Sequence, residues 1–288
     1  MKLQVENHLL FRTVWRAANL FLAAAVVCSL YAGVREYSLR QYLRGFSDAV
    51  VPESATAEKK LETILAWMKD GPSRYVAADP AKLSARDPKT TLNYEQLLSV
   101  CGTATNAFLN LARSGGLRVR RLLLLTPEHN TKHVVAEVLV DGRWIIVDPA
   151  YRVMLRDASG QLLTRDELRN PAVFAEATGA VPGYLSEYNY DHYAHVRMAR
   201  LPFNGFGLRW ALNVAIPQWD EAMDWSLLLE RESFLLLIAS AILTLFFLLL
   251  RELLAWYADS RLRIPRFHLR EHVIRAGVAF FSTPEIKQ

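Results

Sequence analysis

Three residues of the chain have side chains suited to acyl transfer, namely Cys101, His133 and Asp148. A cysteine thiolate is a nucleophile, a histidine can take its proton, and a carboxylate can orient the histidine ring. The sequence has two cysteines, and the other, Cys28, falls inside an apolar run, so no disulfide partner is expected for Cys101. A lone thiol is a liability in an oxidising compartment. Cys101 is therefore a candidate nucleophile, with a buried structural cysteine as the alternative.

The local sequence also predicts the elements that must position these side chains. Residues 101–113 have a helical pattern that ends at Ser114-Gly115-Gly116. Cys101 then begins a helix, where free N–H groups and the helix dipole favour a thiolate. Strand patterns follow at 117–126, 132–140 and 143–147. Asp141-Gly142 between two apolar runs indicates a two-residue hairpin turn.

The predicted turn sets the register of the hairpin. A two-residue turn at 141–142 pairs Val140 with Arg143 and places residue 135 opposite Asp148. Because side chains alternate along a strand, His133 then lies on the same face as Asp148, as its diagonal neighbour at about 7–8 Å. A three-residue turn would move the two side chains to opposite faces.

These residues resemble the catalytic triad of the transglutaminase-like superfamily, which shares a papain-like core. The resemblance covers about residues 90–152. It rests on a cysteine at a helix start, a histidine that opens one strand, and an Asp-Pro pair that closes the next. His133 follows Cys101 by 32 residues and Asp148 follows His133 by 15, and both spacings are ordinary for the family. Trp144 and Pro149 also fit its pattern.

The resemblance implies a reaction through a thioester. His133 takes the proton of Cys101, the thiolate attacks an amide or ester carbonyl, and Asp148 fixes the histidine tautomer. The backbone N–H of Cys101 and one further donor would hold the oxyanion, with Gln96 and Tyr94 as the candidates. Water as the acceptor makes the enzyme a protease or amidase, whereas an amine makes it a transamidase, and the residues leave both open.

The expected fold class is α+β, with a transglutaminase-like, papain-like core in which the helix that begins at Cys101 packs on an antiparallel sheet. The core occupies about residues 57–152 and starts with an amphipathic helix at 57–70. An aromatic-rich extension covers residues 153–232. Its rings have three open interpretations: they complete the core, form an aromatic belt near a membrane, or stack on a ligand.

Two uncharged apolar runs flank this domain, at residues 17–34 and 233–250. Each has 18 residues, which rise about 27 Å as a helix and approach the roughly 30 Å of a hydrocarbon core. Both are predicted to span a membrane. A cleavable signal peptide is the alternative for the first run, because arginines precede it.

Positive charge after the second run predicts the orientation. The residues concerned are Arg251, Arg261, Arg263, Arg266 and Arg270. Segments 1–16 and 251–288 are therefore expected in the cytoplasm and the domain at 35–232 outside it, in a two-pass protein of the cell (inner) membrane. The basic tail also contains aromatic residues and is expected to contact membrane lipid.

Composition and motifs argue against a disordered chain, a nucleic-acid-binding protein and a metal site. The chain has 288 residues, of which 52% are hydrophobic and 22% charged, with a formal net charge of +5, so it is not a disordered polypeptide. No groove-reading motif accompanies the arginines, so no nucleic acid is expected. His129, His133 and Glu137 would align as metal ligands only on a helix, and the valines among them favour a strand. Neither a metal nor another cofactor is expected.

Together these features predict a membrane-anchored cysteine enzyme that cleaves or transfers an acyl group through a Cys101 thioester. The resemblance points to a peptide, protein or glycopeptide of the cell envelope as substrate. Two alternatives remain open. One is a catalytically silent binding or assembly module of an envelope or polysaccharide system, and the other is an acyltransferase that uses a thioester or lipid donor.

Overall fold

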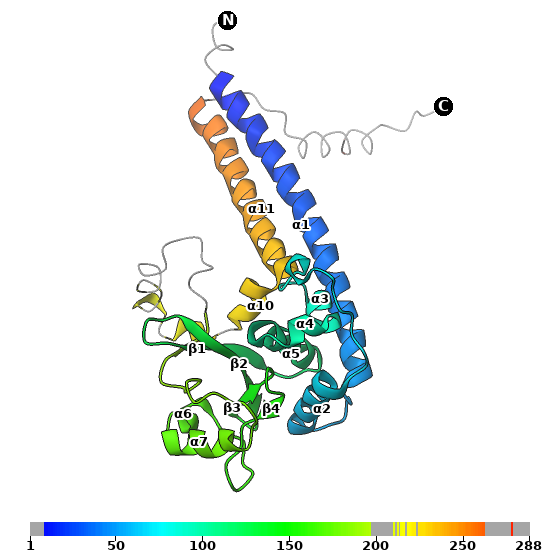
Figure 1. Cartoon of the computed structure of the whole chain (residues 1–288). Coiled ribbons are helices and arrows are strands. Elements are labelled where there is room, and N and C mark those ends of the chain that lie inside the picture. The colour runs from blue at the N-terminus through cyan, green and yellow to red at the C-terminus, as the bar shows by residue number, and fades with distance from the viewer. Residues whose placement is uncertain are drawn as a thin grey trace, which may run out of the picture. The chain divides into compact units, whose positions relative to one another are not determined.

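The computed structural model describes residues 9–196, 218–222 and 224–262, together with positions 210, 212, 214–216 and 278. The chain divides into two compact units (Figure 1). One comprises Met1–Leu30 with Ala239–Gln288, and the other Tyr31–Ile238. Most of the predicted basic tail and part of the aromatic-rich extension lie outside the described residues.

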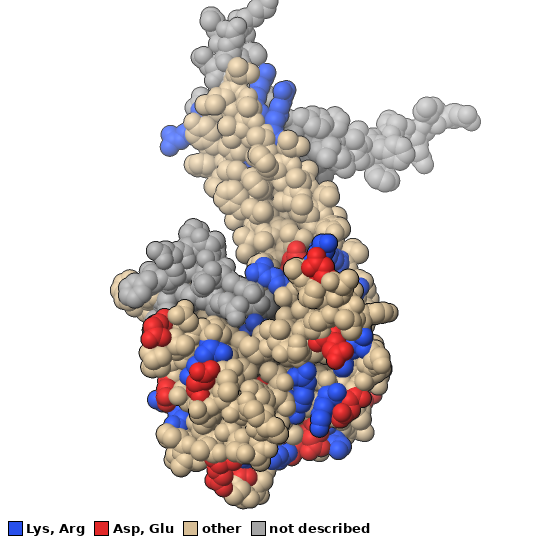
Figure 2. Space-filling model, viewed as in Figure 1, with Lys and Arg blue, Asp and Glu red and all other residues tan. Residues whose placement is uncertain are grey.

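Two long helices contain the apolar runs, namely α1 (Leu9–Val50) and α11 (Glu232–Tyr257), which is followed by a π-helical turn at Ala258–Leu262. Both are long and apolar enough to cross a membrane. Within the first unit Phe21 stacks on Phe247, with ring centroids 5.5 Å apart, and the hydroxyls of Ser29 and Thr244 share a hydrogen bond of 3.1 Å. Figure 2 shows charged side chains interspersed over the second unit, in contrast to the uncharged apolar stretches of the two helices.

The helices of the second unit are short. They are α2 (Ala57–Asp70), a 3₁₀ turn (Pro80–Lys82), α3 (Pro88–Asn93), α4 (Glu95–Leu98), α5 (Cys101–Ser114), α6 (Arg165–Leu168), α7 (Pro171–Gly179), α9 (Trp219–Ala222) and α10 (Trp225–Glu230). The predicted helix at 57–70 is confirmed, with the hydroxyl of Thr56 accepting a hydrogen bond from the Lys59 N–H at its start. Such a cap satisfies one of the N–H groups that a helix start leaves free.

A five-stranded antiparallel sheet forms the centre of the second unit, in the order β4-β3-β2-β1-β5. The strands are β1 (Val119–Leu125), β2 (Thr131–Val140), β3 (Arg143–Asp148), β4 (Val153–Met154) and β5 (Tyr193–Ala194). The three predicted strands are confirmed, with ends that differ by one or two residues. The α+β fold class is likewise confirmed.

The β2–β3 hairpin has the predicted two-residue turn. Val140 pairs with Arg143, and the pairing continues to Ala136 opposite Val147. Asp141 and Gly142 both have positive φ, at 48° and 81°, which a type I′ turn requires at both central residues. The register therefore gives His133 and Asp148 the same parity, and hence the same face of the sheet.

Each face of the sheet is covered by its own hydrophobic cluster. On one face, Ala136 and Val138 of β2 pack with Phe108 of α5 and Leu61 of α2. On the other face, Val135 of β2 packs with Leu122, Ile146, Leu168, Phe174 and Tyr190. The alternation along β2 thus places α2 and α5 on one side of the sheet and the segment around α6 and α7 on the other.

Candidate active site

Cys101 is the first residue of α5, and its side chain is partly buried. A hydrogen bond with His133 is the main influence on its pKa and lowers it, whereas burial raises it. The charge of His133 and hydrogen bonds from the backbone at Val134 and Gly102 lower the pKa further, so the net shift is downward. Cys101 thus begins a helix as the sequence predicts, and the lowering of its pKa is due mainly to His133, with a smaller contribution from the backbone.

His133 connects the thiol to a buried carboxylate. Its Nε2 atom lies 2.7 Å from Oδ2 of Asp148, and the two side chains are 2% and 0% exposed. Burial alone would lower the pKa of His133, but hydrogen bonds and charge interactions with Asp148 and Cys101 outweigh it and raise the pKa to about 9. An imidazolium between a thiolate and a carboxylate is the charge arrangement that follows.

Asp148 is held by the backbone that follows β3. Its Oδ1 atom accepts hydrogen bonds from the N–H groups of Ala150 at 3.0 Å and Tyr151 at 3.3 Å. Because these bonds occupy one carboxylate oxygen, the other is directed at His133. The backbone thus fixes the orientation of the Asp148 carboxylate, and the carboxylate fixes the orientation of the His133 ring.

Two residues connect the segment around Cys101 with the segments that contain His133 and Asp148. The hydroxyl of Thr105, one turn into α5, donates to the carbonyl of Val134 at 3.0 Å. The guanidinium of Arg152 donates to Leu98 O, three residues before Cys101, and to Pro149 O, one residue after Asp148, both at 2.6 Å. Sequence reasoning missed Arg152, because its position depends on a left-handed backbone (φ 59°) that no local motif indicates.

Tyrosines surround the imidazole of His133. Tyr188 stacks on it with ring centroids 4.2 Å apart and an interplanar angle of 6°. Tyr151 and Tyr184 approach edge-on, at 5.9 and 6.3 Å. Tyr190 is fully buried in the cluster beneath. The tyrosines at 184–190 therefore complete the core, which is one of the three interpretations that the sequence left open. Two of them, Tyr184 and Tyr188, also contact the ring of His133, and sequence reasoning did not predict this contact.

The two candidates for the second oxyanion donor lie just before Cys101. The side chain of Gln96 in α4 exchanges hydrogen bonds with Ala77, accepting from its N–H at 3.4 Å and donating to its carbonyl at 3.2 Å. The ring of Tyr94 lies 5.8 Å from that of Tyr75. One N–H of the Gln96 amide remains for another acceptor. The oxyanion assignments of Gln96 and Tyr94 stay predictions.

The structure does not bring together the three residues of the alternative metal site. His133 is engaged with Asp148, and His129 lies in the turn before β2 with a positive φ of 63°. Glu137 contacts His195, with Oε2 and Nε2 2.7 Å apart, and Arg120 at 2.5 Å. Within the described ranges there is no group of three or more potential metal-ligating His, Cys, Asp or Glu side chains.

The comparison with known proteins agrees with this geometry. Residues 44–149 match the family model of the transglutaminase-like superfamily. The matched segment contains Cys101, His133 and Asp148. No curated protein and no solved structure matches the chain. The chain thus carries a domain of the transglutaminase-like superfamily, extending from the end of α1 through β3.

Proposed function

We propose that this protein is a membrane-anchored cysteine enzyme that cleaves or transfers acyl groups through a thioester on Cys101. The observation that carries the proposal is the 2.7 Å contact between Nε2 of His133 and the buried carboxylate of Asp148. The same histidine lowers the pKa of the partly buried Cys101 thiol. The transglutaminase-like superfamily consists in general of cysteine-dependent enzymes, which agrees with this proposal.

The chemistry follows from the charges at the site. The Cys101 thiolate attacks the carbonyl carbon of an amide, and the new S–C bond forms while the carbonyl oxygen becomes an oxyanion near the Cys101 N–H. The oxyanion collapses, the C–N bond breaks, and imidazolium His133 gives its proton to the departing amine. His133 then takes a proton from an incoming water or amine, which attacks the thioester and releases the thiolate. Asp148 stabilises the imidazolium whenever it forms.

The substrate class is a peptide, protein or glycopeptide of the cell envelope. Two helices with the length and composition of membrane spans support an enzyme that meets its substrate near a membrane. The excess of arginine after the second apolar run supports a catalytic domain outside the cytoplasm.

Thiol alkylation as a function of pH tests the proposal. The full chain, solubilised in mild detergent and carrying Cys28→Ser, leaves Cys101 as its only cysteine. We expect iodoacetamide to label Cys101 rapidly near pH 6, and His133→Ala to slow this labelling. Unperturbed thiols titrate near about pH 8.5. Labelling that rises only above that pH, unchanged by His133→Ala in folded protein, would contradict an enzyme and favour a silent binding module.

A reactive thiol would justify a test of the reaction itself. Incubation with amide-bearing peptides separates the outcomes, because hydrolysis releases an amine or ammonia and leaves a carboxylate. Transamidation instead joins an added labelled amine to the peptide. Transfer from an activated thioester, with no amine released from amides, would support the acyltransferase alternative.

A further inference from the structure

A cavity lined by four arginines lies outside the candidate active site. It has a volume of about 460 Å³, and its guanidinium groups belong to Arg40, Arg44, Arg113 and Arg231. No acidic side chain lines it. Ligand pockets commonly have volumes of about 300–1,000 Å³, so the cavity is large enough to hold part of a small molecule. We refer to it as the arginine cavity.

Arg231 is the most deeply placed of the four, with 6% of its side chain exposed. Burial lowers the pKa of Arg231 to about 10, and the nearby charges of Arg113 and Arg40 lower it as well, whereas Glu36 raises it. Its Nη2 atom lies 3.2 Å from Glu36, but its buried Nε has no hydrogen-bond acceptor among the described residues. A buried N–H without an acceptor is costly, and an anion in the cavity would supply one.

The carboxylates around the cavity are too few to neutralise it. Glu36 contacts Arg40 at 2.7 Å as well as Arg231, and also accepts a hydrogen bond from Ser233 at 2.7 Å. Asp224 accepts from Nε of Arg113 at 3.0 Å. Within the part of the chain that the structure describes, no ion pair is formed by Arg44. Among the described side chains, three of the four arginines therefore share two carboxylates, and Arg44 is left without one.

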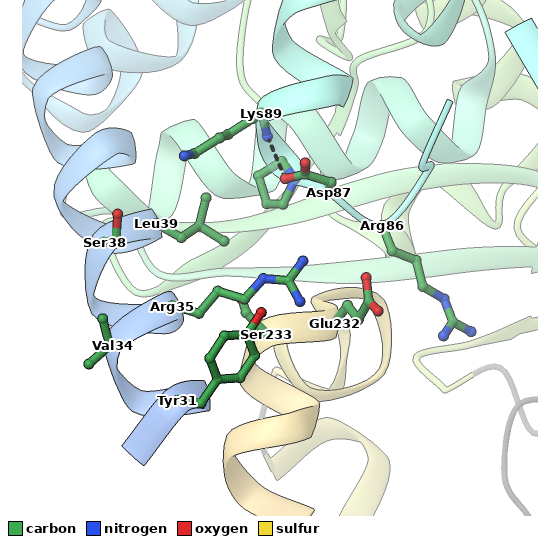
Figure 3. Close-up of a pocket in the computed structure, with 11 residues that line it drawn as sticks. Tyr31, Val34, Arg35, Ser38, Leu39, Arg86, Asp87, Lys89, Glu232 and Ser233 are labelled. Atoms are coloured by element: carbon green, nitrogen blue, oxygen red, sulfur yellow. Dashed lines mark hydrogen bonds between the residues drawn. The ribbon is translucent and has the colours of Figure 1, made fainter. Parts of the chain in front are cut away.

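A second cavity in the same unit provides a contrast (Figure 3). It has a volume of about 400 Å³ and is lined by residues that include Arg35, Arg86, Lys89, Asp87 and Glu232. Figure 3 shows the carboxylate of Glu232 between the guanidinium groups of Arg35 and Arg86. Three cations and two carboxylates line this cavity, whereas four arginines and no carboxylate line the arginine cavity.

We propose that the arginine cavity binds the phosphate of an anionic lipid headgroup. Guanidinium groups present several N–H donors in a plane and suit phosphate oxygens. The positions in the chain also fit, because Arg231 comes two residues before the second apolar run and Arg40 six residues after the first. Six helical residues rise about 9 Å from the end of the apolar run. Lipid headgroups lie at this distance outside the roughly 30 Å hydrocarbon core. Arginines near such a surface are attracted to anionic lipid.

This inference rests on the membrane anchoring in the proposed function, and the experiment separates the two. The full chain in nanodiscs of mixed phosphatidylglycerol and phosphatidylcholine is released into detergent, and native mass spectrometry counts the lipid that stays bound. We expect retained phosphatidylglycerol on the parent and about tenfold weaker retention for Arg44→Gln, as loss of a direct hydrogen bond between a guanidinium group and a phosphate predicts. Arg35→Gln is the matched control, since it removes an arginine of the same helix that lines the other cavity.

Several results would overturn the proposal. Equal retention of the two lipids, or equal loss in Arg44→Gln and Arg35→Gln, would remove the arginine cavity as the site. Inorganic phosphate that binds in detergent with the same dependence on Arg44, and no retained lipid, would assign the cavity to a soluble anion. Thermal melting of each variant confirms folding, and Arg40→Gln repeats the test from a second position.

Alkaline carbonate extraction of membranes tests the anchoring by itself. Retention in the membrane together with no lipid preference would contradict this inference alone. Release into the soluble fraction would contradict the anchoring and, with it, the lipid site. Neither result depends on the reactivity of Cys101.

Discussion

Nε2 of His133 lies 2.7 Å from Oδ2 of Asp148, although the two residues are 15 positions apart on different strands. The contact follows from the hairpin register, which gives both side chains the same face of the sheet. Both side chains are buried, so water does not compete for the bond. Asp148 contributes to the raised pKa of His133, and His133 contributes to the lowered pKa of Cys101.

Replacing Asp148 by asparagine tests that control. Asp148→Asn retains an acceptor for Ala150 and Tyr151 but removes the negative charge beside the imidazole. We expect the pKa of His133 to fall, the thiolate of Cys101 to become less favoured, and alkylation near pH 6 to slow about tenfold or more, the change that one pKa unit gives. Asp166→Asn, an exposed carboxylate on α6, should leave the rate unchanged.

The contribution of the His133–Asp148 pair to the stability of the fold should decrease as the pH rises. In the parent chain, Asp148 and Cys101 raise the pKa of His133 against the opposing effect of burial. In Cys101→Ala the thiol no longer titrates, and we expect the hydrogen bond and the charge of Asp148 to keep the pKa of His133 above its ordinary value of about 6.5. A raised native pKa means that the contribution to stability is complete below about pH 6.5 and is lost as the pH rises through the native pKa.

We therefore expect the free energy of unfolding of Cys101→Ala to exceed that of Cys101→Ala/His133→Gln most at about pH 6, and the difference to shrink toward about pH 9. Guanidinium unfolding in mild detergent measures both variants at each pH. A difference that stays constant or grows with pH would show that His133 is not held as an imidazolium in the native state.

The ring of Tyr188 should matter more than its hydroxyl. The ring stacks on His133 at 4.2 Å, and aromatic pairs are worth about 0.5–1.5 kcal/mol beyond the area they bury. We expect Tyr188→Phe to keep stability and alkylation rate, and Tyr188→Leu to lose about 1 kcal/mol and to slow alkylation. Equal behaviour of the two variants, measured by unfolding and labelling, would argue against a role for stacking.

Arg152 should act as a positioning residue. Its bonds to Leu98 O and Pro149 O tie the segment before Cys101 to the segment after Asp148. We expect Arg152→Gln to lose about 2 kcal/mol or more, because hydrogen bonds from charged groups contribute about 1.5–3 kcal/mol each. Alkylation of Cys101 should also lose its dependence on His133, a change that loss of stability alone would not cause.

Arg143→Gln is the matched control for Arg152. Arg143 pairs with Glu167 at 2.8 Å, but both side chains are exposed, and such pairs contribute about 0–1 kcal/mol. Unfolding and alkylation of Arg143→Gln should therefore match the parent. A loss as large as that of Arg152→Gln would show that any arginine replacement on this surface disturbs the site.

Local signals explain which parts of the fold could be predicted. The helix at 57–70 has a capping threonine, a single apolar face and a terminating Gly71, and its bounds are confirmed. The register of the hairpin could be predicted because Asp-Gly strongly favours a type I′ turn, and Asp141 and Gly142 have the positive φ angles of that turn. The placement of His133 and Asp148 on one face follows from those two residues alone.

Other parts depend on contacts distant in sequence. The strands β4 and β5 have two residues each, too few for a period, and exist because β3 and β1 pair with them. The continuation of α1 to Val50 had a signal that sequence reasoning did not use, since Leu39 and Leu43 recur at helical spacing and are buried. Tyr188 and Arg152 had no such signal, because packing places them.

The pair formed by Glu137 and His195 has a practical consequence. Like His133 and Asp148, it is a buried imidazole 2.7 Å from a carboxylate, but its neighbours are Arg120 and Arg165 rather than a thiol. The resonances of His195 can therefore serve as an internal reference for those of His133 in NMR experiments. In one histidine-resolved NMR titration, alkylating Cys101 should move the resonances of one imidazole and leave those of the other in place.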